Sequence, residues 1–191
     1  MALAHSSQNF SVNDAAVYKL TTDPSGANPT YAAKVDVAGV QELTSSIEME
    51  LKRLYGDNTL IAVQSIFRGV KGKLTYGRFN FDLMGAITTA SATDSGTTPF
   101  QKTVITLAQF DLPAKFKMET QTKQVDYVGG DMHELYWKCT AAGLDMLGHN
   151  NQDFKIQVID FETEPLIGTP TGYPANSWVT AIANETAVAI V

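Results

Sequence analysis

The chain has 191 residues, which is enough for one domain with a substantial core. Charged residues make up 18% of it, below the ~25% of an average soluble domain, which favours a subunit whose flanks are buried against copies of itself. The formal net charge of −6 argues against a dedicated nucleic-acid binder, because attraction to phosphates is the main source of such affinity.

Short strands separated by polar turns are predicted in the first part of the chain. Residues 1–13 are small and polar, and we expect an N-terminal arm that becomes ordered against a neighbour. They lack the charged start and apolar centre of a signal peptide. Alternating apolar residues predict strands at 15–21 and 33–40, and two prolines and a glycine predict a loop at 23–29.

The stretch 47–87 is the most informative part of the sequence. Apolar residues alternate with Glu48 and Glu50, which predicts a half-buried strand at 47–54. Residues 60–67 are almost continuously apolar, which predicts a strand covered on both of its faces.

Two turns are predicted around this second strand. The residues at 55–58 are expected to turn the chain into the strand 60–67. The glycines of 69–72 predict a hairpin turn, after which Leu74 and Tyr76 continue as a strand.

A short helix is predicted at 81–87, capped by Asn80 or Asp82, with Leu83 and Ile87 on one face. The rest of the chain reads as further strands joined by polar segments. The predicted segments are a loop at 88–99, strands at 104–107, 114–119, 135–140 and 154–161, and a turn at 128–131.

The end of the chain is predicted to be irregular at 167–174 and β-prone at 186–191. A free apolar strand promotes aggregation, so the last segment either pairs inside its own domain or adds to a neighbour's sheet. Many short strands with one helix predict a mainly β fold, either a β-sandwich or a partly closed barrel. The predicted domain is 14–166, between the arm 1–13 and a C-terminal extension at 167–191.

No pattern predicts catalytic, cofactor-binding or metal-binding residues. His133 is not followed by the second histidine that a helical zinc site needs. Asp160, Glu162 and Glu164 alternate along one predicted strand, which is more typical of a solvated edge than of a calcium or acid–base site. The GxxG pattern at 69–72 lacks the flanking helices of a nucleic-acid clamp.

The single cysteine, Cys139, excludes an intrachain disulfide and is predicted to be a buried thiol. No apolar run approaches the ~20 residues of a membrane span. We therefore expect a protein that is made in a reducing cytoplasm and has no membrane partner.

The order of these segments resembles the major tail tube proteins of long-tailed, siphovirus-like bacteriophages. The resemblance spans roughly residues 31–166. It rests on the turn YGDN, the apolar strand after it, the glycine pair, the helix FDLMGAI, and the later segments LPAKFKMETQT, HELYWKCTA and DFKIQVIDFETEPL.

This resemblance implies a structural virion protein that assembles into stacked hexameric rings and forms the channel for DNA delivery. In that family, hairpins of neighbouring subunits join into one β-barrel around the channel, and the matching segments here are 43–54 and 60–79. The candidate barrel residues are Ile47, Met49, Leu51, Ile61, Val63, Phe67, Gly69, Gly72, Leu74 and Tyr76. The candidate ring-to-ring contacts are Asp23, Pro24, Asn28, Asp94, Ser95, Trp178, Val188 and Ile190.

The resemblance also implies partners and a location. The partners would be copies of the chain itself, a tape measure protein, tail terminator and distal tail proteins, and phage DNA in transit without specific binding. The protein would be made in the host bacterial cytoplasm and reside in the virion tail. The alternatives are a type VI secretion tube-like protein and a virion decoration or binding module, and we do not expect an enzyme.

Overall fold

The computed structural model describes residues 9–57, 59–109, 111–124, 129–148 and 153–190, and strands dominate this part of the chain. Its one α-helix is α1 (Phe81–Ile87). The predicted mainly β fold with a single short helix is therefore confirmed. The strands are β1 (Asn9–Thr22), β2 (Thr30–Tyr31), β3 (Val35–Asp36), β4 (Val40–Gly56), β5 (Thr59–Tyr76), β6 (Thr93–Ser95), β7 (Lys102–Val104), β8 (Lys115–Gln124), β9 (Asp131–Asp145), β10 (Gln157–Thr163) and β11 (Val179–Asn184).

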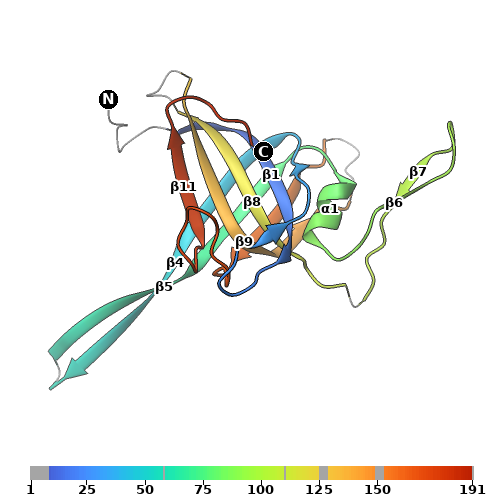
Figure 1. The fold of residues 1–191 in the computed structure, drawn as a ribbon. Coiled ribbons are helices and arrows are strands. Elements are labelled where there is room, and N and C mark those ends of the chain that lie inside the picture. The colour runs from blue at the N-terminus through green and yellow to red at the C-terminus, as the bar shows by residue number, and fades with distance from the viewer. Residues whose placement is uncertain (1–8, 58, 110, 125–128, 149–152, 191) are drawn as a thin grey trace.

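Among the described residues, nine strands form one antiparallel sheet that curls around a core (Figure 1). Their order is β2-β1-β8-β9-β10-β5-β4, with β3 beside β1 and β11 beside β9. β10 and β11 follow each other along one edge of β9, because β10 pairs with its C-terminal half and β11 with its N-terminal half. β1 also contacts β4 at the far end of this order, so the sheet is strongly curved.

The main core lies on the concave side of this sheet. Tyr76, Phe116, Tyr136 and Phe161 are its largest fully buried side chains, and they come from four different strands. Cys139 is fully buried in the same core, as predicted. Burial raises the pKa of its thiol, so the neutral form persists.

The helix α1 covers part of this core. Asn80 caps it, because its side-chain oxygen accepts hydrogen bonds from the backbone N–H of Asp82 and Leu83 at 2.9 and 3.3 Å. Leu83 and Ile87 are completely buried, as their four-residue spacing predicts. A helix of seven residues is unstable alone, so this packing holds it in place. α1 is too short to traverse a bilayer, and no other helix in the described part of the chain could do so.

Several predicted boundaries are wrong. The expected strand at 33–40 is reduced to β3, because a turn at 38–39 with Gly39 at a φ of 74° separates it from β4. The expected loop 88–99 contains β6, which pairs with β7, and β7 lies earlier than the strand predicted at 104–107. The predicted turn at 128–131 begins outside the described residues and ends in β9.

Both ends of the chain are more integrated than predicted. Residues 9–13 pair with β8 as part of β1, so the predicted arm 1–13 is wrong for them, and residues 1–8 lie outside the described residues. The predicted extension 167–191 supplies β11 to the main sheet. Ile190 is buried against Ala16 and Tyr18, so the described end of the chain packs on its own domain without forming a strand.

Candidate assembly interface

β4 and β5 form a two-stranded arm that leaves the body of the protein (Figure 1). The two strands pair over almost their whole length, whereas β10 accompanies β5 only as far as the pair Glu162–Lys71. We call residues 46–70 the arm. A ribbon of two strands is marginally stable in water, so a further surface is needed to support it.

The chain reverses at the tip of the arm between Gly56 and Thr59. Asp57 has a φ of 49°, a left-handed conformation that aspartate adopts more readily than most residues. The predicted reversal of the chain in this region is therefore confirmed, but Tyr55 and Gly56 still belong to β4, and position 58 lies outside the described residues.

The hairpin turn predicted at 69–72 is wrong, because these residues lie inside β5. Glu48 pairs with Gly69 and Met49 with Phe67, so Arg68 is an extra residue and forms a β-bulge. Gly69 has a φ of 154°, and an added Cβ would lie 3.0 Å from the Trp178 ring. The glycine therefore serves a bulge at the point where the arm leaves the body.

One face of the arm is apolar. The register places Ile47, Met49, Leu51, Val63 and Phe67 on this face, which continues the face that carries Leu43 and Leu74 into the core. Beyond the body, most of this face is uncovered in the described part of the chain: Met49 is 64% exposed, Leu51 59% and Ile47 56%, whereas Phe67 contacts the Trp178 ring. We call these five residues the apolar face.

Further apolar side chains surround the tip. Leu54, Tyr55, Leu60 and Ile61 are all exposed, and of these only Ile61 was among the predicted barrel residues. The prediction that the strand 60–67 is covered on both faces is wrong within one subunit. Contiguous exposed apolar residues of this extent are typical of an interaction surface rather than of a free monomer.

The arm also has unpaired backbone edges. β4 is the last strand in the sheet order, and in the described part of the chain β5 has no second neighbour from 59 to 70. Open edges of long strands readily pair with another chain. Each arm thus offers two open edges and one uncovered apolar face.

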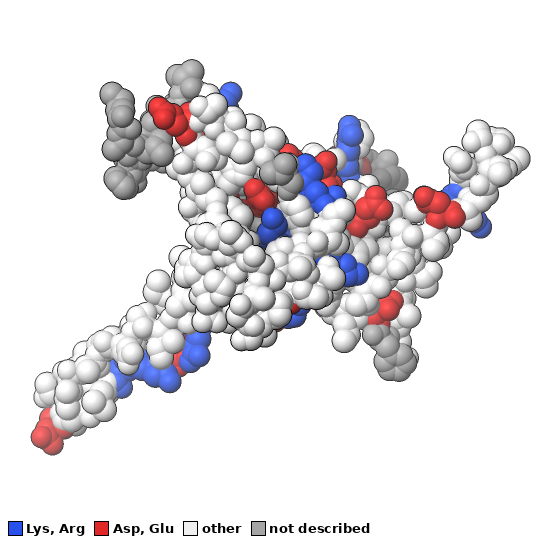
Figure 2. Space-filling model, in the orientation of Figure 1, with Lys and Arg blue, Asp and Glu red and all other residues white. Residues whose placement is uncertain are grey.

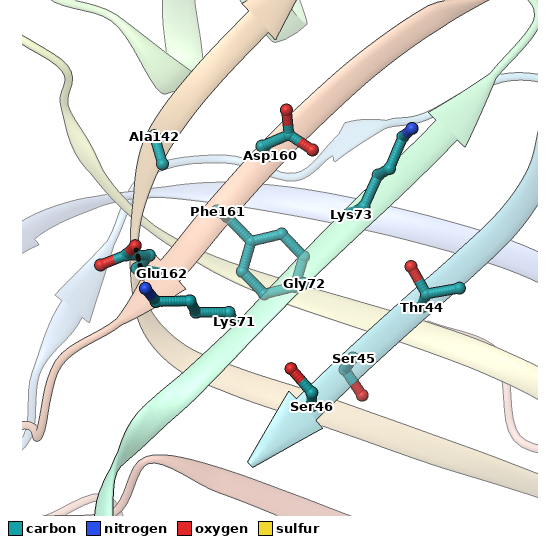
Figure 3. Close-up of a pocket in the computed structure, with 10 residues that line it drawn as sticks. All are labelled: Thr44, Ser45, Ser46, Lys71, Gly72, Lys73, Ala142, Asp160, Phe161 and Glu162. Atoms are coloured by element: carbon teal, nitrogen blue, oxygen red, sulfur yellow. Dashed lines mark ion pairs between the residues drawn. The ribbon is translucent and has the colours of Figure 1, made fainter. Parts of the chain in front are cut away.

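At the base of the arm, neighbouring atoms pack closely against Gly72. Gly72 pairs with Phe161 of β10 and Ser45 of β4, and an added Cβ would lie 2.3 Å from the Phe161 ring and 2.9 Å from the Thr44 carbonyl oxygen. Figure 3 shows this ring lying across Gly72 in a shallow pocket. The predicted barrel residues Leu74 and Tyr76 lie further into the body and are completely buried in the core.

A second projection carries β6 and β7 away from the body (Figure 1). Phe100 and Leu112 in this region are 81% and 69% exposed. Asp94 and Ser95, two predicted ring-to-ring contacts, lie in β6 and are exposed, and Asp94 accepts a hydrogen bond from Thr103. These two residues are accessible, and their contact role stays a prediction.

Other predicted contact residues serve the subunit itself. Asp23 is nearly buried and accepts hydrogen bonds from Lys138 and from the backbone N–H of Gly168. Ile190 is 4% exposed, so it offers almost no surface to a neighbour. Trp178 makes an edge-to-face contact with Phe67, and Asn28 donates a hydrogen bond to Thr171. Val188 and Pro24 remain accessible.

A buried polar cluster lies beneath the end of the chain. His133 contacts Glu119 through Nδ1 at 2.9 Å, and Asp131 and the Val188 carbonyl oxygen through Nε2 at 3.1 and 2.9 Å. Burial alone would lower the pKa of His133, but the hydrogen bonds to the two carboxylates outweigh it, and the pKa is raised. Both ring nitrogens face acceptors, so the imidazolium form fits this site.

We expect stability to depend on pH through His133. A pKa that is raised by folding stabilises the fold fully below the unfolded value of about 6.5. This stabilisation is lost as the pH rises through the folded pKa. Urea denaturation at several pH values from about 5.5 to 8.5 should show this alkaline loss in the wild type and a flatter profile in His133→Gln. Parallel profiles for the two proteins would assign the pH dependence to other groups.

No group of three His, Cys, Asp or Glu residues is placed to hold a metal ion in the described parts of the chain. The arm, with its exposed apolar side chains and open strand edges, is therefore the candidate functional site. No protein-family model and no curated protein matches this sequence.

Proposed function

We propose that the protein is a structural subunit that polymerises through its arm, as the major tail tube protein of a long-tailed phage does. The observation that carries this proposal is the apolar face, which the subunit builds and leaves uncovered. In the proposed assembly, six copies form a ring and the rings stack into a tube. The apolar face of each arm packs against a neighbouring copy.

The open edges of the arm suit a ring of identical copies. Rotation about an axis along the strands keeps every strand direction, so β5 of one copy meets β4 of the next in the antiparallel sense. Each such contact repeats the pairing that β4 and β5 already make within the subunit. A closed ring then leaves no edge unpaired, which removes the aggregation hazard of a free arm.

A channel wide enough for duplex DNA requires more strands from each copy than the two strands of the arm. With strands about 4.8 Å apart and tilted by about 40°, two strands from each of six copies close a barrel about 24 Å across at the backbone. Side chains would narrow it below the width of a DNA duplex. We therefore infer that β10 and β9, the next strands in the sheet order, also contribute to the wall.

Electron microscopy of the concentrated protein tests the proposal. We expect negatively stained rings or tubes, and a mass of a multiple of the subunit by light scattering. A monomer at all concentrations would contradict it, and a stable trimer that does not extend would favour the decoration or binding module. Tubes alone do not separate a phage tail from a type VI secretion tube, so particles purified from phage lysates would need to contain the chain.

A further inference from the structure

We infer that the face of the arm opposite the apolar face lines the channel, and that ion pairs neutralise its basic side chains so that duplex DNA passes without binding. This inference rests on the proposed function. It goes further by assigning the two faces of the arm and by specifying the chemistry of the wall.

The opposite face of the arm is mainly polar, although the register also places Leu54, Ala62 and Ile66 on it. The register places Ser46, Glu48, Glu50, Lys52 and Gln64 on it. The four residues of β4 alternate along the strand with residues of the apolar face, and Gln64 of β5 pairs with Lys52. Arg68 joins them from the bulge, because its side chain reaches Glu50. We call this surface the polar face.

The polar face continues onto the body. Lys71 and Lys73 of β5 pair in register with Glu162 and Asp160 of β10, so their side chains lie on the same side of the sheet. Figure 3 shows the four side chains around the base of the arm, with the ion pair between Lys71 and Glu162. Figure 2 shows basic side chains gathered along one side of the arm.

The two faces of the arm differ in whether burial against a neighbouring copy is favourable. Burying the apolar face against a neighbouring copy removes large apolar surfaces from water, which is favourable. Burying the polar face in the same way would desolvate several charges. Arg53, near the tip, is the charged exception on the apolar side. The polar face is therefore the one left facing water, and inside a ring this water fills the channel.

The charges of the polar face are balanced among the described residues. Four are basic (Lys52, Arg68, Lys71 and Lys73) and four are acidic (Glu48, Glu50, Asp160 and Glu162). This balance differs from that of the whole chain, whose net charge is −6. The wall is thus not the acidic surface that the composition alone would suggest.

Ion pairs hold most of the basic groups. Lys71 lies between Glu48 at 3.1 Å and Glu162 at 3.0 Å, which connects β4, β5 and β10. Hydrogen bonds to Glu162 and Glu48 raise the pKa of Lys71, so it stays charged. Arg68 pairs with Glu50, which also lies 4.0 Å from Lys52. In the described part of the chain, Lys73 is the one of the four without a recorded ion pair.

These pairs contribute little to folding, because every partner is substantially exposed to solvent. Their effect is on what the surface binds. A free lysine or arginine attracts a phosphate and releases counterions from DNA, and identical copies around a channel multiply each such contact. A carboxylate already held at Lys52, Arg68 and Lys71 competes with the phosphate there and keeps these three basic groups from retaining DNA.

Cysteine accessibility tests the assignment of the faces. Gln64→Cys reports on the polar face, and Met49→Cys and Val63→Cys report on the apolar face, while the buried Cys139 keeps the background low. In assembled tubes, we expect a small maleimide to label the first variant, and a maleimide on a globular protein carrier to be excluded. The apolar-face cysteines should react with neither reagent. Before assembly, all three should react with both.

Binding of short duplex DNA tests the neutralisation. The double variant Glu48→Gln/Glu50→Gln removes the carboxylate that pairs with Arg68 and Lys52 and one of the two partners of Lys71. Its tubes should bind duplex DNA at least about tenfold more tightly at low salt. Addition of Arg68→Gln should reverse much of the gain. The matched control Asp153→Asn/Glu185→Gln makes the same change in charge at exposed body positions and should leave binding near the wild-type level.

The outcomes separate the inference from the proposed function. Absence of tubes overturns both. Tubes in which the apolar-face cysteines are labelled and the polar-face cysteine is protected overturn the assignment of the faces. Tubes whose DNA affinity is unchanged in the double variant, or rises equally in the control, overturn the neutralisation and leave the tube proposal standing.

Discussion

Met49→Lys/Leu51→Lys should strongly impair assembly while leaving the subunit folded. Both side chains are more than half exposed in the single subunit, so lysine meets no obstacle there. In the assembly the same positions would be buried, and each lysine would have to lose its hydration without a partner. We expect the concentration needed for ring or tube formation to rise by at least about tenfold.

The matched control places two lysines on the polar face of the same arm. Ser46 and Gln64 are exposed and point away from the apolar face, so Ser46→Lys/Gln64→Lys should assemble at nearly the wild-type concentration. Sedimentation velocity measures assembly, and circular dichroism with thermal melting checks that all variants are folded. Normal assembly of the apolar-face variant would remove the main support for the proposed function.

The sequence predicts local structure well where the conformation of a residue is determined mainly by residues close to it in the chain. The helix α1 is an example, because its cap Asn80 and its buried pair Leu83 and Ile87 all follow from short-range spacing. The alternation at 114–119 likewise corresponds to β8 (Lys115–Gln124), whose buried residues include Phe116 and Met118.

The sequence predicts the arm only in part, because apolar patterning does not say which chain covers a strand. The apolar residues at 60–67 predict a strand that is buried on both faces. The subunit nevertheless leaves Leu60, Ile61 and Val63 exposed. The strand pairing that would reveal this is long-range. It depends on where β10 stops accompanying β5, which no local pattern records.

The same reasoning explains the error at 69–72. Two glycines near basic residues are typical of a hairpin turn, but they are equally typical of a strand that contains a bulge or is closely approached by other side chains. The structure uses Gly69 for a bulge and Gly72 for a close approach to Phe161. Phe161 lies 89 positions further along the chain from Gly72, so this contact was not visible in the sequence. Val188 and His133 likewise meet only through the fold.

Gly72→Ala should destabilise the subunit itself, before any assembly. At an ordinary strand position, alanine would be more stable than glycine by roughly 0.5–1 kcal/mol. Here the new Cβ would lie 2.3 Å from a ring that is 1% exposed and 2.9 Å from a backbone oxygen, and neither can move freely. Overpacking of this kind costs about 1–3 kcal/mol, so we expect a net loss of stability.

A double-mutant cycle identifies the cause of that loss. Phe161→Leu alone should destabilise the core by leaving space, but in Gly72→Ala/Phe161→Leu the shorter side chain should make room for the new methyl group. We expect the two changes to cost less together than the sum of their separate effects, by roughly 0.5–3 kcal/mol in urea denaturation. Gly77→Ala is the matched control, because its new Cβ would meet its nearest atoms at ordinary distances of 3.5 and 3.6 Å. Strict additivity would show that the Phe161 ring does not set the requirement for glycine at position 72. It would then return Gly72 to a role in assembly, where its substitution should impair ring formation more than the fold.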